Sequence, residues 1–172
     1  MLRSMIYEYI PQFSKMLGNL SKILEKAQGH ADQKKFESTN LLQSRLIADQ
    51  FHLIRQVQIA CDTAKTFAAK LTGKEPPKHE DNETTVAQLQ ERIQKTVQYL
   101  NTFKADDFKG WESRKITNPR REGKYLPGTD QAMQHSIPNF YFHVTTAYSI
   151  LRANGVEIGK KDYLGDIPYR DL

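Results

Sequence analysis

Apolar residues recur at alternating steps of three and four along four stretches of this chain, the spacing that keeps them on one face of an α-helix. The first stretch carries Ile6, Ile10, Phe13, Leu17, Leu20, Leu24 and Ala27. Tyr9, Met16 and Ile23 widen its stripe, which suits a helix with two neighbours in a bundle. Pro11 predicts a helix start or a kink, and Gln28-Gly29 predicts the helix end.

The second stretch begins near Glu37 and reaches Leu71, with an interruption predicted around Ala48-Asp49-Gln50. Its apolar face consists of Ile54, Val57, Cys61, Ala64, Ala68 and Leu71. Gly73 and Pro76-Pro77 predict its end.

The third stretch opens with a capping box, in which Thr85 and Gln88 satisfy each other's free backbone amides. Its apolar face consists of Val86, Leu89, Ile93, Val97 and Leu100. Together these features predict a helix that starts sharply after Thr85.

The fourth stretch contains the segment PNFYFHVTTAYSILRANGV. Its stripe consists of Met133, Ile137, Phe140, Val144, Ala147 or Tyr148, and Leu151. Gly155 is expected to take the left-handed position after the helix, with Val156 reaching back to Leu151. Pro138 predicts a kink, or a short lead-in separated from the main helix.

Two regions lie outside the four stripes. Residues 104–128 form a long connection in which the flanks around Ile116 and Tyr125 could pair as a short hairpin. The aromatic tail after Gly155 is expected to be ordered, with its apolar side chains along the bundle: Tyr163, Leu164, Ile167 and Tyr169. We therefore predict an all-α four-helix bundle with a long third connection, forming a single domain over residues 1–172.

Composition narrows the function classes. The 172 residues are 38% hydrophobic and 26% charged, which is a normal soluble balance. No apolar run is long enough for a bilayer, the N-terminus does not resemble a signal peptide, and Cys61 stands alone. These features predict a cytoplasmic protein without membrane contact. Paired acidic residues such as Glu80-Asp81 are interpreted as solvated turns.

The net charge of +5 favours anions in general. The best anion-facing candidate is the connection around Trp111 and Tyr125, which carries Arg114-Lys115, Arg120-Arg121 and Lys124. Basic residues beside aromatic ones could contact phosphates and stack bases, but such a loop is more often simply solvated. Nucleic-acid binding is not expected.

Three segments together resemble one known family: LLQSRLIADQFHLIRQVQIACDTAK, DNETT and PNFYFHVTTAYSILRANGVEIGKKDYLG. They resemble a bacterial family of domains of unknown function, number nineteen-ninety-three, within the DinB/YfiT-like superfamily of metalloenzymes. The resemblance covers Met5 to Gly165 and implies a DinB-like four-helix bundle, commonly dimeric. It assigns no reaction. Some relatives are metal-dependent thiol transferases or isomerases that hold the metal with one histidine on the second helix and two on the last.

This chain departs from that ligand set. His143 stands for the second histidine of the last-helix pair, but Asn139 occupies the position four residues earlier. His52 is the only candidate on the second helix, and His135 is separated from His143 by Pro138. Because an amide is a poor ligand for zinc or nickel beside imidazole, no tightly held metal is expected. A divalent metal, zinc or nickel, held by His52, Asn139 and His143 stays as the alternative.

His143 is expected to be buried on the shoulder of the apolar stripe, where it needs a hydrogen-bond partner such as Asn139 or Gln56. We interpret the cluster of Gln56, Asn139, His143 and Tyr148 as structural or as a pocket for a small molecule. The alternative function is a divalent-metal-dependent transferase or isomerase acting on a small thiol-linked substrate. The sequence leaves open whether the protein is an enzyme.

Two further expectations concern single residues. Cys61 lies on an apolar stripe and is interpreted as an inert core thiol. Phe142 lies almost opposite the centre of its stripe, so a lone bundle would expose it unless the tail covered it. An exposed aromatic of this size favours a homodimer.

Overall fold

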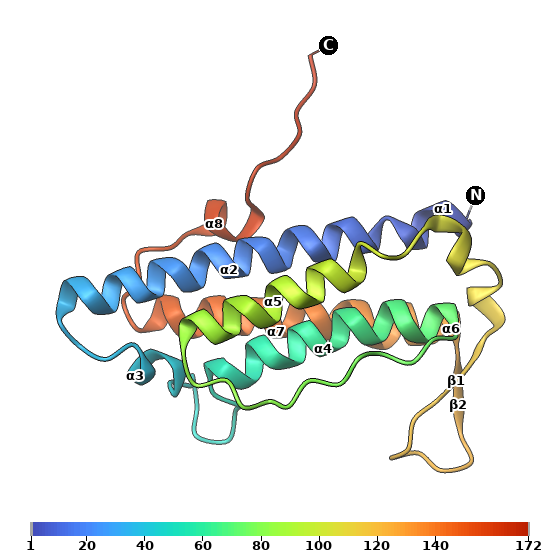
Figure 1. Ribbon diagram of the computed structural model, residues 1–172, viewed down its shortest axis with the longest axis horizontal. Helices are drawn as coiled ribbons and strands as arrows, with labels where there is room; N and C mark the ends of the chain where they lie inside the picture. The colour runs from blue at the N-terminus through green and yellow to red at the C-terminus, as the bar shows by residue number, and fades with distance from the viewer. Residues whose placement is uncertain (1, 172) are drawn as a thin grey trace.

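The computed structural model describes residues 2–171, with side chains from Met5 onward, and shows a bundle of four long helices (Figure 1). They are α2 (Tyr9–Lys34), α4 (Leu53–Thr72), α5 (Val86–Leu100) and α7 (Ile137–Ala153). Helix α4 packs against both α5 and α7, and α2 contacts the same two helices from the other side. The predicted all-α bundle is confirmed.

The connections set the directions of the helices. Residues 73–85 run back along α4 before α5 begins, so α4 and α5 point the same way, while α2 and α7 run opposite to them (Figure 1). Each of the pairs α4–α7 and α2–α5 is therefore antiparallel. Shorter elements complete the chain: α1 (Leu2–Tyr7), α3 (Thr39–Leu42), 3₁₀ turns at Ala105–Phe108 and Trp111–Ser113, α6 (Gly128–Asp130), a π-helical segment (Gln131–Ser136) and α8 (Lys160–Leu164).

The core is aromatic where three helices meet. The ring of Phe13 lies 4.2 Å from that of Phe140 and 5.1 Å from that of Phe67, centroid to centroid. All three rings are fully buried, and the stripe residues of α4 are buried with them. Rings of this size supply much of the apolar burial that holds the bundle together.

Most predicted helix ends are present. The capping box forms, with Gln88 N donating to Thr85 Oγ1 (3.2 Å) and Thr85 N donating to Gln88 Oε1 (3.1 Å). Gly155 has φ of +83°, and Val156 N donates to the carbonyl of Leu151 at 3.1 Å. The interruption around residues 48–50 is also present, because the chain is not helical between α3 and α4.

The predicted end of the first long helix at Gln28-Gly29 is wrong. Helix α2 continues to Lys34, since Ala31 is buried one turn further along the same face. It stops where Lys35 takes a left-handed conformation and Phe36 N donates to the carbonyl of Ala31 at 3.0 Å. One helical glycine therefore costs too little to override burial on both sides of it.

The predicted division at Pro138 is present, but one residue of the fourth stripe lies elsewhere. The lead-in comprises α6 and the π-helical segment, and Pro138 occupies the first turn of α7. Met133 was expected on the apolar face and is instead 52% exposed. A π-helical turn holds more residues than an α-helical one, which shifts the phase of the stripe before α7 begins.

The long third connection forms the expected hairpin, with β1 (Lys115–Thr117) antiparallel to β2 (Tyr125–Pro127) and Ile116 opposite Leu126. No helix within residues 2–171 is long and apolar enough to cross a bilayer.

The tail agrees with expectation only up to Gly165. Tyr163 packs against the bundle, and its backbone carbonyl accepts a hydrogen bond from Asn19 Nδ2 at 3.0 Å. Gly165 then has φ of +62°, and a Cβ there would lie 2.5 Å from Asn19 Oδ1. The chain turns away from the bundle at this point (Figure 1), so Ile167 and Tyr169 do not lie along it and Tyr169 is 87% exposed.

Candidate functional site

Polar side chains face one another along the seam between α4 and α7. Because these helices are antiparallel, Gln56 in the first turn of α4 faces His143. Thr63, two turns further along α4, faces Asn139, which comes one turn before His143. Gln56 Oε1 lies 2.7 Å from His143 Nδ1, and Asn139 Nδ2 donates to Thr63 Oγ1 at 2.9 Å. The predicted partners of His143 thus separate: Gln56 contacts the ring and Asn139 does not.

The hydrogen bonds of Gln56 fix the protonation of His143. Gln56 Nε2 donates to the backbone carbonyl of Phe51 at 2.9 Å, so its Oε1 points toward the imidazole. His143 Nδ1 must then carry the proton and donate it, which leaves a lone pair on Nε2. His143 is 8% exposed, and burial together with the charge of Arg55 lowers its pKa to about 4. The imidazole is therefore neutral at physiological pH.

His52 caps a helix and is not placed as a metal ligand. It is the N-cap of α4, and its Nδ1 accepts a hydrogen bond from Arg55 N at 3.3 Å. With Nδ1 as acceptor, the proton lies on Nε2, which cannot bind a metal in that state. Burial and the charge of Arg45 also lower the pKa of His52.

The three sequence-predicted ligands therefore do not fit a metal site as they stand. Of them, only His143 offers a free ring nitrogen, while Asn139 is bonded to Thr63 and His52 caps a helix. Within residues 2–171, no group of three His, Cys, Asp or Glu side chains is placed to hold a metal ion.

Tyr148, the fourth member of the predicted cluster, lies beside the tail. Its ring packs edge-on against Tyr163, with centroids 6.1 Å apart, and Tyr163 Oη lies 3.1 Å from Thr145 Oγ1. Tyr148 thus packs against α8 and does not complete a pocket with His143.

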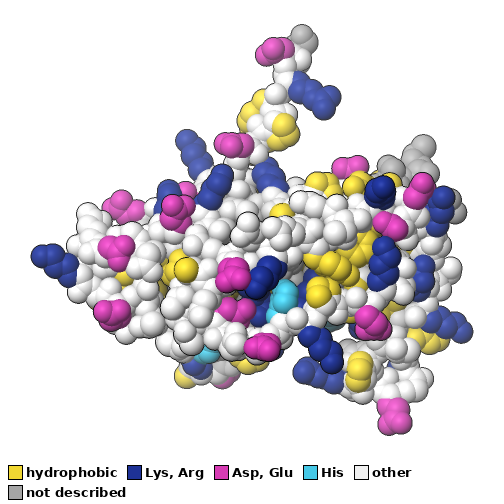
Figure 2. Space-filling view, viewed as in Figure 1, with side chains coloured by type: hydrophobic (Ala, Val, Ile, Leu, Met, Phe, Trp, Pro, Cys, Tyr) yellow, Lys and Arg dark blue, Asp and Glu magenta, His cyan; other side chains and the backbone are white. Residues whose placement is uncertain are grey.

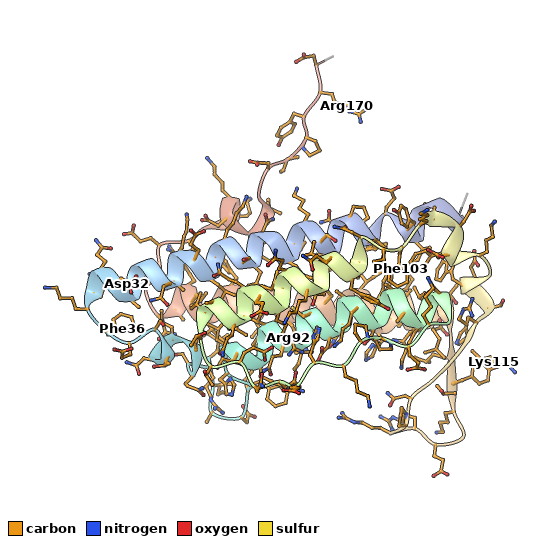
Figure 3. All side chains as sticks on the ribbon, in the orientation of Figure 1. Asp32, Phe36, Arg92, Phe103, Lys115 and Arg170 are labelled. Atoms are coloured by element: carbon orange, nitrogen blue, oxygen red, sulfur yellow. The ribbon has the colours of Figure 1, made fainter. Side chains whose placement is uncertain are left out.

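A second polar cluster, which sequence reasoning missed, centres on Arg92 of α5. Arg92 is 3% exposed, and Figure 3 shows it between α5 and α4. Its Nη2 lies 2.8 Å from Asp62 Oδ1, and its Nη1 lies 3.0 Å from Glu83 Oε1 and 2.7 Å from Asp81 Oδ1. Arg55 pairs with Asp81 as well, at 2.7 Å. Asp81 is exposed, as the sequence suggested, but it also forms ion pairs with both arginines.

The Arg92 cluster is mutually stabilised. Burial alone would raise the pKa of Glu83, but hydrogen bonds from Gln58 and Arg92 hold that pKa below its ordinary value. Burial opposes the charge of Arg92 in the same way, and Glu83 and Asp62 raise its pKa overall. Figure 2 shows acidic and basic side chains side by side over this part of the surface. The cluster attaches the 73–85 connection to both α4 and α5.

Cys61 lies beneath this cluster and offers no reactive thiol. It is fully buried, and burial raises the pKa of its thiol to about 12. A thiol that stays protonated and has no access to solvent is a poor nucleophile.

The four long helices and the polar seam between α4 and α7 define a four-helix bundle with a buried polar cluster between two of its helices. The chain belongs to the family described as a domain of unknown function (DUF1993), whose profile matches residues 6–164. It is similar to a DinB family member protein from Shewanella denitrificans, with 54% identity and a TM-score of 0.96, over 99% of this chain and 98% of that one. No curated protein matches. The family and fold implied by the resemblance are confirmed.

Proposed function

We propose that this protein is a homodimeric bundle module in which the Gln56–His143 pair is structural. The observation that carries the proposal is the bridge made by Gln56, whose amide joins the His143 ring to the backbone of Phe51. The pair ties the loop between α3 and α4 to α7. A buried, hydrogen-bonded polar pair of this kind fixes how two elements meet.

Two exposed phenylalanines adjoin this bridge. Phe51 is 57% exposed, and Phe142 is 54% exposed and packs edge-on against His143 with centroids 5.1 Å apart. The Phe142 ring thus lies against His143, and the backbone of Phe51 is bonded to Gln56 of the same pair. The tail does not cover Phe142, since it leaves the bundle after Gly165. We propose that a second copy of the chain covers this face, as the family resemblance implies.

Sedimentation tests the dimer with a matched pair of variants. The wild type at micromolar concentration should sediment at twice the chain mass of 19.9 kDa. Phe142→Ser should shift it toward the monomer. Met133→Ser, which changes a side chain of nearly equal exposure in the lead-in to α7, should leave the dimer intact. A monomeric wild type, or equal disruption by both variants, would refute the dimer at this face.

Metal analysis of protein purified without a histidine tag tests the structural role. A chelator should leave the melting temperature of the wild type unchanged, because the seam is held by hydrogen bonds. The alternative of a metal-dependent transferase or isomerase would require stoichiometric zinc or nickel and a chelator effect as large as that of His143→Ala. That result would overturn the structural reading of His143.

A further inference from the structure

A cleft of about 500 Å³ lies between the hairpin, α4 and the π-helical segment, and we propose that it binds a small organic anion. The anion would carry a phosphate or carboxylate group on an apolar body. This site is separate from the His143 seam, and the inference does not rest on the proposed dimer. Figure 2 shows basic side chains gathered around the hairpin.

The charged lining of the cleft has one sign. Lys70 enters from α4, and Arg121 and Lys124 enter from the hairpin turn, whereas no Asp or Glu of the described chain lines it. Among residues 2–171, none of these three cations forms an ion pair. Lys70 Nζ instead donates to the carbonyl of Thr117 at 3.2 Å, which holds it beside the hairpin. Cations converging without counter-charges create a positive potential that attracts an anion.

The π-helical segment supplies polar groups on the opposite wall. Gln131 Nε2 donates to Ser136 Oγ at 3.0 Å and lies 3.2 Å from His135 Nδ1. When Gln131 donates to that nitrogen, His135 carries its proton on Nε2, which becomes a donor for a ligand. Segments of π-helix occur often at functional sites, and this one brings residues 131, 135 and 136 together.

The remaining wall is apolar, which decides the ligand class. Ile116 is buried at its base, while Tyr125 and Leu126 of β2 are partly exposed. Lys115 Nζ lies 5.0 Å from the Tyr125 ring centroid and adds positive charge behind that ring. Trp111 is buried, so it cannot stack on a base as a nucleic-acid site would require. An amphipathic cleft of this size suits a compact molecule with one anionic end.

Calorimetric titration with three probes separates the contribution of the anionic group from that of the apolar body. Naphthyl phosphate should bind at least about tenfold more tightly than inorganic phosphate, which lacks the body, or naphthol, which lacks the charge. Arg121→Ala and Lys124→Ala should each weaken naphthyl phosphate by about tenfold. Tyr125→Ser should weaken naphthyl phosphate but leave inorganic phosphate unchanged.

Arg120→Ala is the matched control, because Arg120 is the neighbour of Arg121 in the turn but does not line the cleft. It should change the affinity by less than about twofold. An equal loss in Arg120→Ala would show attraction by diffuse charge and refute the site. Failure of naphthyl phosphate to bind at millimolar concentration would also refute it. Much tighter, steeply salt-dependent binding of a single-stranded oligonucleotide would replace the small anion with nucleic acid.

Discussion

Acid should destabilise this protein through His143, by an amount that follows from its burial. The pKa of His143 is lowered from 6.5 to about 4 in the folded protein. The two values differ by about 2.5, and about 1.36 kcal/mol for each tenfold change in proton affinity gives about 3 kcal/mol. This is the largest loss that one imidazole can produce here.

The direction of the effect follows from which state binds the proton first. Above pH 6.5 the imidazole is neutral in both states, so its contribution to stability is fully present. As the pH falls from 6.5 toward 4, the unfolded chain takes up a proton that the folded chain does not. The contribution of His143 to the free energy of unfolding therefore declines across that window and levels off below it.

Urea unfolding at a series of pH values measures this decline. Trp111, the only tryptophan, is buried and reports unfolding through its fluorescence. His143→Gln is the comparison, because its amide can still donate to Gln56 but does not titrate. The wild-type curve should fall below the variant's by about 2–3 kcal/mol between pH 7 and 4, at one protein concentration. Parallel curves would show that His143 protonates without cost and would refute its neutral, buried state.

Two further predictions concern the cluster on α5 and the thiol beneath it. Arg92→Ala should lower the free energy of unfolding by about 2–3 kcal/mol, measured by urea unfolding, because Asp62 and Glu83 lose their shared cation; Lys95→Ala, which removes only a surface pair, should cost under about 1 kcal/mol. Cys61 should resist an aromatic disulfide reagent in the native protein and react once per chain in urea, and rapid native labelling would contradict its burial.

The fold could be predicted because each long helix carries its own periodic pattern and its own stop signal. Thr85 with Gln88, and Gly155 with Val156, are local devices that work without knowledge of the rest of the chain. The errors arose where distant contacts decide. The continuation of α2 past Gly29 depends on burial by other helices, and the departure of the tail depends on Asn19 meeting Gly165.

In the polar sites too, helical phase predicted some features and loop contacts decided the others. Gln56 and His143 could be paired from helical phase, because both lie on the shoulders of neighbouring stripes. The tautomer could not, since the backbone of Phe51 sets it through a loop whose path no periodicity describes. His52 likewise could be placed near the start of a helix, but only the loop geometry shows that it caps that helix.

The burial of Arg92 could have been predicted from the periodicity of α5. Arg92 lies three residues after Leu89 and four before Thr96, and that spacing alone places an arginine on the core-facing side of α5. A guanidinium buried there requires carboxylates as partners. Few carboxylates lie on a neighbouring helix, or in the connection that leads into α5, close enough to reach it. Asp62 lies on α4, and Asp81 and Glu83 both lie in the DNETT segment. One buried arginine thus predicts that the long connection lies beside α4 and α5, which is where the ion pairs place it.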